Sequence, residues 1–242
     1  MRFLFAALIA LSVAWSAYWW FGSSREADQI AAWLSETDRL DATAQTIQGF
    51  PNRFDTTLEN VVVNLGTVTW RLDWLQLFRL SYRPGHYIAS FAPEQNVDVQ
   101  GSVWRLRTQD SRASVIFAEA AFDNSSAVFS ELSLTAPDRT NFSAEEMLFA
   151  TRRVPAGYEV ALRLTGFGVG DRVADINLDG IVSVEEGIVV GTLMIGTTDS
   201  DVLGEIGATL GVTGLQPGAT LDMTSEGVSL NGALIAPPFI VP

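Results

Sequence analysis

The sequence predicts a mainly β protein that is attached to a membrane by an N-terminal transmembrane helix. Residues 3–21 contain no charged side chain. From about residue 47 onward, apolar and polar residues alternate with the two-residue period of a β-strand. Glycine and proline turns interrupt this alternation at short intervals, which is typical of antiparallel sheets. We therefore expect a transmembrane anchor over residues 1–22, an amphipathic helix over 23–46 and an extracytoplasmic β-rich domain over 47–242.

The apolar segment has the length of a membrane span. Its 19 residues reach about 28 Å as an α-helix, close to the thickness of the hydrocarbon core. Arg2 precedes the segment and Arg25 follows it, so the positive-inside rule predicts a cytoplasmic start and a single pass. The aromatic residues 18–21 suit the outer interface. The alternative is a signal peptide cleaved near residues 14–16, although bulky aromatics directly after that site fit cleavage poorly.

The next segment has the pattern of an amphipathic helix, with Ser24 as its N-cap. Its other face carries acidic side chains rather than a basic run, so we expect it to pack on the sheet and not on the membrane surface. The apolar stripe at helical spacing consists of Ile30, Trp33, Leu34, Thr37 and Leu40.

The alternation that follows predicts a long curved antiparallel sheet, with a closed β-sandwich as the alternative. A hairpin is expected where residues 147–154 and 158–164 flank Pro155-Ala156-Gly157. Ser143 with Glu146 could instead form a capping box at the start of a helix. A weak repeat relates residues 186–195 to residues 226–235, each beginning with an acidic-glycine turn.

Composition excludes several functions. The formal net charge of −13 disfavours nucleic-acid binding, which needs a basic surface. The chain has no cysteine and one histidine, His86, so thiolate chemistry, a zinc site with several imidazoles and a Ser-His-Asp relay have little to work with. We expect no enzymatic activity, and no cofactor unless calcium binds at the loop described next.

Residues 175–186 match the calcium-loop pattern D-x-[DN]-x-[DN]-G-x5-E. Poor helix formers on both sides, together with the Asp179-Gly180 pair, favour a β-hairpin instead. The alternative remains a calcium-dependent structural or adhesion module, because these residue types supply the oxygen ligands that calcium prefers. The ligands would be Asp175, Asn177, Asp179, Ile181, Ser183 and Glu186.

Two short motifs resemble a known family. The segments are residues 49–54 (GFPNRF) and 74–95 (WLQLFRLSYRPGHYIASFAPEQ). They are similar to the bacterial family called domain of unknown function 2125 (DUF2125), which in turn resembles envelope proteins of the AsmA type. The resemblance implies a bacterial inner-membrane anchor and a curved periplasmic sheet with an apolar groove implicated in lipid traffic. The residues that carry it are Gly49, Pro51, Arg53, Tyr82, Pro84 and His86.

These patterns suggest a protein that binds or shields an apolar ligand, such as lipid acyl chains, on one face of the sheet. The membrane itself is the other expected partner, contacted through residues 3–21. Five large residues at strand spacing are the candidates for an apolar groove: Trp70, Leu72, Phe78, Leu80 and Tyr82.

Overall fold

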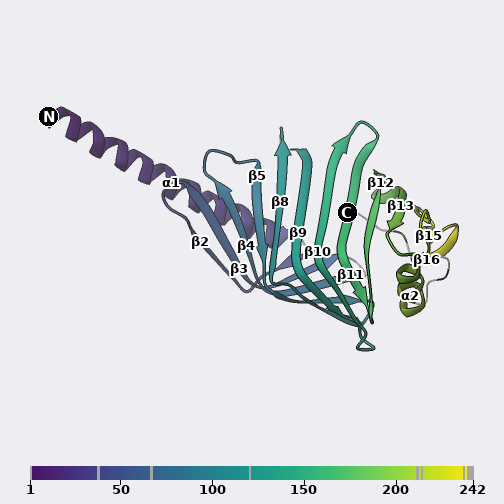
Figure 1. The fold of residues 1–242 in the computed structure, drawn as a ribbon. Helices are drawn as coiled ribbons and strands as arrows, with labels where there is room; N and C mark the ends of the chain where they lie inside the picture. Colours follow the sequence, from purple (N-terminus) through teal and green to yellow (C-terminus); the bar gives the residue numbers. More distant parts are fainter. Residues whose placement is uncertain are drawn as a thin grey trace.

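The computed structural model describes residues 2–36, 39–65, 68–119, 121–210, 213, 215–236 and 238. A long N-terminal helix leads into one large antiparallel sheet, and a second helix lies near the far end of the sheet (Figure 1). All sixteen described strands belong to this sheet, so the mainly β fold is confirmed. The β-sandwich alternative is wrong for these strands, because they do not divide into two sheets.

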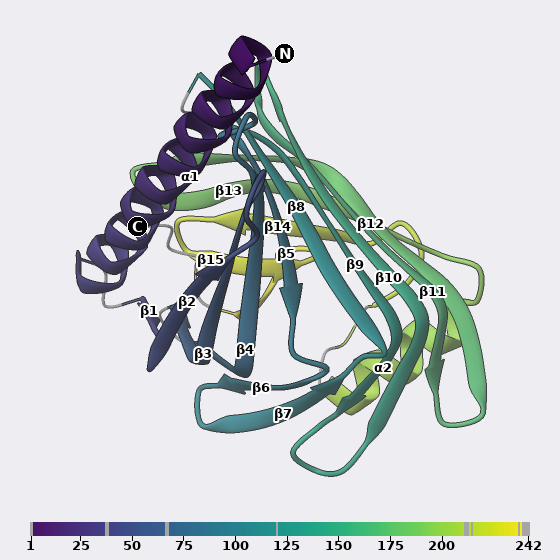
Figure 2. The ribbon, with the colours of Figure 1, turned by 90° about the vertical axis from the view of Figure 1, so that its left-hand side faces the viewer.

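The strands follow one another mostly as a meander, and Figure 2 shows the sheet curling around so that β13–β15 pass behind the front strands. The elements are α1 (Arg2–Glu36), β1 (Leu40–Asp41), β2 (Ala44–Gln48), β3 (Arg53–Leu65), β4 (Val68–Leu80), β5 (His86–Phe91), β6 (Glu94–Val99), β7 (Ser102–Arg107), β8 (Asp110–Ala118), β9 (Ala121–Thr135), β10 (Asn141–Val154), β11 (Gly157–Val169), β12 (Arg172–Glu185), β13 (Ile188–Thr197), α2 (Ser200–Leu210), β14 (Thr220–Thr224), β15 (Gly227–Leu230) and β16 (Ala233–Ala236).

Helix α1 is continuous, which corrects the predicted division into an anchor and a second helix over 23–46. Ser24 lies inside α1 instead of capping a new helix, and its hydroxyl donates to the Trp20 carbonyl one turn earlier at 3.0 Å. The helix ends by Glu36, and residues 44–48 form β2. Good helix formers carry α1 through residues 25–34, whereas Thr43 and Thr46 favour extended backbone.

The apolar stripe of the predicted second helix is confirmed only in part. Ile30 is buried and Leu34 packs beside it against the sheet. Leu40 is buried in the same cluster, but it comes from strand β1. The Trp33 side chain and Thr37 lie outside the described residues.

The long strands bend partway along their length (Figure 1). Leu58 and Val61 in β3 are both buried although they are three residues apart, which a straight strand does not allow. Asn60, between them, has a positive φ of 50°. Glu131 in β9 and Gly166 in β11 have the same backbone feature at the corresponding bends. The bends reverse the alternation and keep apolar residues on the same side of the folded sheet.

The bend also explains why four strands are short. Above it in Figure 1, β4 pairs with β5 and β8 pairs with β9. Below it, β4 pairs with β6 and β7 pairs with β9. Strands β5 and β6 therefore act as one bent strand interrupted at Ala92-Pro93, and β7 and β8 as another interrupted at Thr108-Gln109. Proline has no backbone donor, so Pro93 fits a break between ladders.

Both helices pack on the same side of the sheet, which we call the inner face. Helix α1 contributes Ile30 to a cluster with Leu58, Val61 and Leu72. Helix α2 contributes to the largest core cluster through Val202, Leu203 and Ile206, against strands β9–β13. Residues that point the opposite way along the same strands form the outer face, which is richer in charged side chains.

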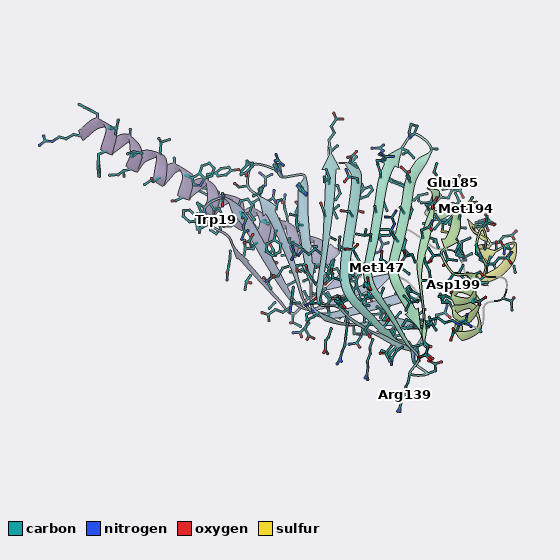
Figure 3. The ribbon with its side chains drawn as sticks, in the orientation of Figure 1. Trp19, Arg139, Met147, Glu185, Met194 and Asp199 are labelled. Carbon is teal, nitrogen blue, oxygen red and sulfur yellow. The ribbon has the colours of Figure 1, made fainter. Side chains whose placement is uncertain are left out.

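Several local predictions are settled by this topology. The β10–β11 hairpin is confirmed, with Val154 paired to Gly157. Ser143 and Glu146 both lie in strand β10, so the capping box is wrong. The acidic-glycine turn at Glu186-Gly187 joins β12 to β13, and both residues have positive φ. Figure 3 shows Glu185, the residue before this turn, and Arg139 at the lower edge of the sheet.

Candidate functional site

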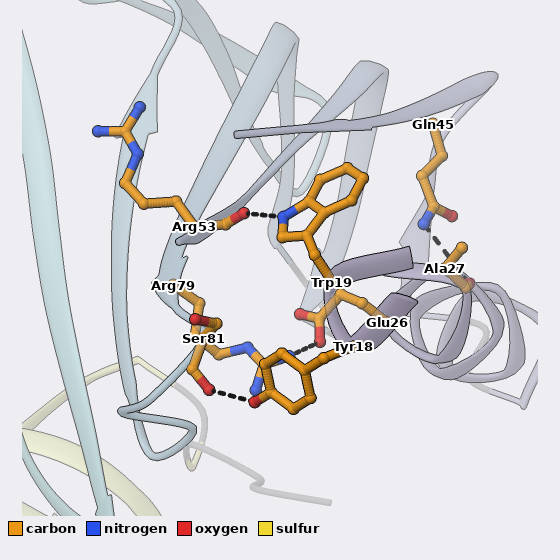
Figure 4. Close-up of polar contacts among 8 residues, drawn as sticks. All are labelled: Tyr18, Trp19, Glu26, Ala27, Gln45, Arg53, Arg79 and Ser81. Carbon is orange, nitrogen blue, oxygen red and sulfur yellow. Dashed lines mark hydrogen bonds and ion pairs between the residues drawn. The ribbon is translucent and has the colours of Figure 1, made fainter. Parts of the chain in front are cut away.

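The sheet is attached to α1 by three polar contacts from aromatic residues (Figure 4 shows two of them). The Trp15 indole donates to the Pro51 carbonyl at 2.8 Å. The Trp19 indole donates to the Arg53 carbonyl at 2.8 Å, and the Tyr18 hydroxyl donates to the Ser81 carbonyl at 3.0 Å. The β2–β3 and β4–β5 turns are therefore held beside residues 15–19 of α1.

Ring packing tightens the same junction. Trp19 makes an edge contact with Phe50 and a stacked contact with Phe54, with ring centroids 5.5 and 6.1 Å apart. Gly22 lies one turn further along α1, and a Cβ built there would be 2.6 Å from the Phe54 ring. A glycine is needed at position 22 so that the helix can approach the sheet this closely.

An ion pair links α1 to the inner face of the sheet. Glu26 is buried and accepts from the Arg79 guanidinium, whose side chain is also largely buried. The guanidinium lies over the rings of Phe54 and Tyr87, 5.1 and 5.6 Å from their centroids, which favours a cation at this place. Burial raises the pKa of Tyr87, although Arg79 opposes the shift, so Tyr87 stays a neutral donor well above physiological pH.

A cavity of about 440 Å³ lies between α1 and the sheet at this junction. We call it the collar cavity. Two buried donors beside it, Arg79 Nε and Ser81 Oγ, have no hydrogen-bond partner within the part of the chain that the structure describes. Arg25 also lines the cavity and has no ion-pair partner among the described residues. The lining includes Tyr18, Arg25, Glu26, Arg79, Ser81 and Tyr87.

The structure brings the two motif segments together around α1, although they are about thirty residues apart in sequence. Gly49 has a φ of +99° and its carbonyl accepts from the Arg53 amide, so it shapes the turn. Pro51 and Arg53 provide the carbonyls that α1 binds. Pro84 lines the collar cavity. Tyr82 is 63% exposed beside them.

His86 faces away from the collar cavity. Its Nε2 lies 2.9 Å from Ser114 Oγ, in a second cavity of about 530 Å³ on the outer face that Arg53, Arg83 and Arg112 also line. Within the described residues, no carboxylate holds the other ring nitrogen, so the third member of a catalytic relay is missing from this pair.

The inner face carries an apolar row that neither helix covers. α1 lies against β2 and α2 against β11 and β12, and the row crosses the strands between these contacts. Its members are neighbours in register, and five of the six are half-buried, while Phe149 is 36% exposed. We call this row the inner strip; it consists of Leu77, Ala89, Ala113, Ala127, Phe149 and Leu162.

The five predicted groove residues do not share one surface. Trp70 and Leu72 belong to the core beneath α1, where the Trp70 indole donates to Gln95 at 2.9 Å. Phe78 and Leu80 line the outer cavity with His86. Tyr82 lies beyond the end of β4 and is exposed. The bend at β3–β4 reverses the alternation between Leu72 and Phe78, which strand spacing alone does not reveal.

The predicted calcium loop is wrong in its geometry. Residues 175–185 lie within strand β12, and ten steps at about 3.3 Å each place its ends roughly 33 Å apart. Ligands spread along an extended strand cannot surround one ion. The favoured interpretation, a β-hairpin, is right in class, but its turn lies at Glu186-Gly187 and not at Asp179-Gly180. The side chains of Asp175, Asn177, Asp179, Ile181, Ser183 and Glu186 remain along the outer face and the turn.

Several residues of the collar were not predicted as site residues. Tyr18 and Trp19 were predicted only as part of an interfacial belt, and Trp15 only as part of the alternative cleavage site, yet each donates a hydrogen bond to the sheet. Glu26 was placed on a solvated polar face. The sequence does not single out Glu26, because Asp28 and Glu36 lie on the same helix; only the burial of its charge, which requires a partner, marks it as different. No feature of the sequence identified Arg79 as the partner of Glu26.

One helix, spanning Arg2–Ala32, is long and apolar enough to cross a membrane, and its apolar window is not buried within the protein. Searches among curated proteins and among solved structures find no match. A family model described as "Uncharacterized protein conserved in bacteria (DUF2125)" matches residues 19–199. The match covers both motif segments and most of the sheet, and the chain therefore belongs to the DUF2125 family of bacterial proteins.

Proposed function

We propose that this protein is a non-catalytic lipid-binding component of the bacterial envelope, anchored in the inner membrane and facing the periplasm. The observation that carries the proposal is the inner strip, an apolar and incompletely covered row on the same side of the sheet as the membrane helix. Acyl chains fit such a surface because apolar area gains about 25 cal/mol per Å² when it leaves water.

Small side chains in the middle of the inner strip support an acyl-chain ligand. Ala89, Ala113 and Ala127 are consecutive neighbours on three adjacent strands, with Leu77 and Phe149 at their two sides. A run of alanines leaves room above the sheet for a thin apolar ligand, whereas large side chains would fill that space. Membrane lipid is the ligand within reach in this proposal, because an α1 that crosses the bilayer would hold the sheet at its surface.

A matched pair of substitutions tests lipid binding. Ala127→Trp places a large ring on the inner strip, and Ser126→Trp places the same ring on the outer face one residue away. Native mass spectrometry of the full-length protein extracted in detergent should detect phospholipid on the unmodified protein and on Ser126→Trp, and largely free protein for Ala127→Trp. Absence of lipid on the unmodified protein, or equal loss in both variants, would contradict the proposal.

The orientation can be tested separately, because the chain has no cysteine. A single cysteine introduced as Ser126→Cys should react with a membrane-impermeant maleimide in intact spheroplasts. The control Arg2→Cys, before the span, should react only after the membrane is opened. The reverse labelling pattern would place the sheet in the cytoplasm and overturn the proposed location.

A further inference from the structure

The collar cavity has features that the inner strip lacks. Charged and apolar side chains line it together, its volume is about 440 Å³, and two buried donors beside it, Arg79 Nε and Ser81 Oγ, have no partner among the described residues. A buried donor without an acceptor costs free energy, and the cost is recovered when a ligand supplies the acceptor. Two such donors beside one cavity therefore indicate a ligand that is rich in acceptors.

The charges at the collar cavity favour an anion. Arg25 and Arg79 line it with a single acid, Glu26, which is already engaged by Arg79. The balance of these three groups is one positive charge, in a chain whose formal net charge is −13. A phosphate ester suits this place, because its oxygens accept from guanidinium and hydroxyl donors and its charge matches the excess cation.

The position of the cavity favours a membrane phospholipid as the source of that phosphate. Tyr18 lines the cavity from the aromatic belt of α1, at the depth where phospholipid headgroups lie. On the sheet, Arg79 pairs with Tyr87, and this pair is the next inward-facing row beyond Leu77 and Ala89 of the inner strip. A headgroup in the cavity is thus directly followed by an apolar surface.

We propose that the collar cavity binds the phosphate group of a membrane phospholipid whose acyl chains continue onto the inner strip. This inference rests on the proposed lipid-binding function and adds the class of headgroup and the residues that recognise it. Arg25, Arg79 and Ser81 contact the phosphate oxygens, and Glu26 holds the Arg79 guanidinium in place.

The binding test compares two lipids with identical chains. The full-length protein in non-ionic detergent is titrated with dioleoyl phosphatidylglycerol and with dioleoylglycerol, which lacks the phosphate, and bound lipid is counted by native mass spectrometry. We expect the phospholipid to bind about tenfold more tightly or better, as two charge-assisted hydrogen bonds predict. Inorganic phosphate at millimolar concentration should not displace it.

Two variants identify the site. Ser81→Ala combined with Arg25→Gln removes a buried hydroxyl without a hydrogen-bond partner and a cation without an ion-pair partner among the described residues, so the fold should be retained. This double variant should lose most of the preference for the phospholipid and keep its affinity for dioleoylglycerol. The control, Thr108→Val with Arg71→Gln, removes another unpartnered buried hydroxyl and an exposed arginine away from the collar, and should change neither affinity.

The outcomes separate the two proposals. If both lipids bind the unmodified protein equally, or if the double variant keeps its preference, the headgroup site is wrong while lipid binding by the inner strip stands. If neither lipid binds, both the headgroup site and the proposed lipid-binding function are wrong. Inorganic phosphate that binds as tightly as the phospholipid would overturn the assignment to a lipid.

Discussion

The two helices of this protein are attached to the sheet in opposite ways. Helix α2 is held by apolar burial, with Val202 and Leu203 almost completely inaccessible to solvent. Helix α1 is held at the collar by polar tips on long side chains: two indoles, a phenol and a carboxylate that reach backbone carbonyls and Arg79. Only its last turns, around Ile30, contribute to a core.

The difference follows from what surrounds each helix. α2 has water on one side, so the hydrophobic effect drives its apolar face onto the sheet. Around residues 15–21, α1 is expected to have lipid on its exposed side, where apolar contact with the sheet gains little over apolar contact with acyl chains. Hydrogen bonds to defined carbonyls then give the junction its geometry, because a dry interface leaves few competing partners.

The largest effect should come from breaking the apolar attachment. Leu203→Ala removes a side chain that is 2% exposed and should lower the free energy of unfolding by about 3–4 kcal/mol, from lost transfer energy and a new cavity. Denaturant unfolding in detergent, followed by circular dichroism, measures it. Gly204→Ala is the control, since a Cβ there meets nothing within 4 Å, and it should raise stability by about 0.5–1 kcal/mol. Equal responses would mean that α2 is not held by burial.

A smaller loss is expected when the ion pair of the polar attachment is broken. Glu26→Gln keeps the shape but leaves the largely buried Arg79 charge uncompensated, which should cost about 2–3 kcal/mol in the same unfolding assay. Asp28→Asn, an exposed acid two residues away on α1, should change stability by less than about 0.5 kcal/mol. A loss for Asp28→Asn as large as that for Glu26→Gln would point to general charge effects on α1.

The smallest effect is expected when a single hydrogen bond between α1 and the sheet is removed. Trp19→Phe keeps an aromatic ring but removes the indole donor to the Arg53 carbonyl, and should cost about 1 kcal/mol. Hydrogen exchange should accelerate in the β2–β3 turn and leave α2 unchanged. The control Trp20→Phe, at an exposed neighbouring residue, should change neither the stability nor the hydrogen exchange of the β2–β3 turn. If the β2–β3 turn of Trp19→Phe exchanges as slowly as in the unmodified protein, ring packing and not the hydrogen bond fixes the junction.

The parts of the fold that could be predicted are those with local signals. The apolar span and the β10–β11 hairpin follow from composition, periodicity and turn residues. Helix α2 was missed although Asp199 caps it through the Asp201 amide at 2.8 Å. Gly204 and Gly207 lower the helix propensity of that segment, and burial of its apolar face overrides them.

The candidate site could be predicted far less well. The motif segments were identified from their residues, but nothing in the sequence shows that they meet at α1. Sheet register depends on pairing between distant strands, and the positive φ at Asn60 reverses which side chains face inward. Trp70 and Phe78 consequently lie on different faces despite their even spacing. The collar cavity joins α1, β3, β4 and the β4–β5 turn, and its unpartnered donors are visible only when those elements are assembled.

Helix α1 runs without a break from Arg2 to Glu36. The apolar segment that is long enough to span a membrane and the segment that packs on the sheet are therefore one rod, with no hinge between them at which the sheet could swing. If α1 spans a bilayer as proposed, any tilt of the rod becomes an equal tilt of the whole sheet, and changes in bilayer thickness would alter the angle at which the inner face meets the membrane.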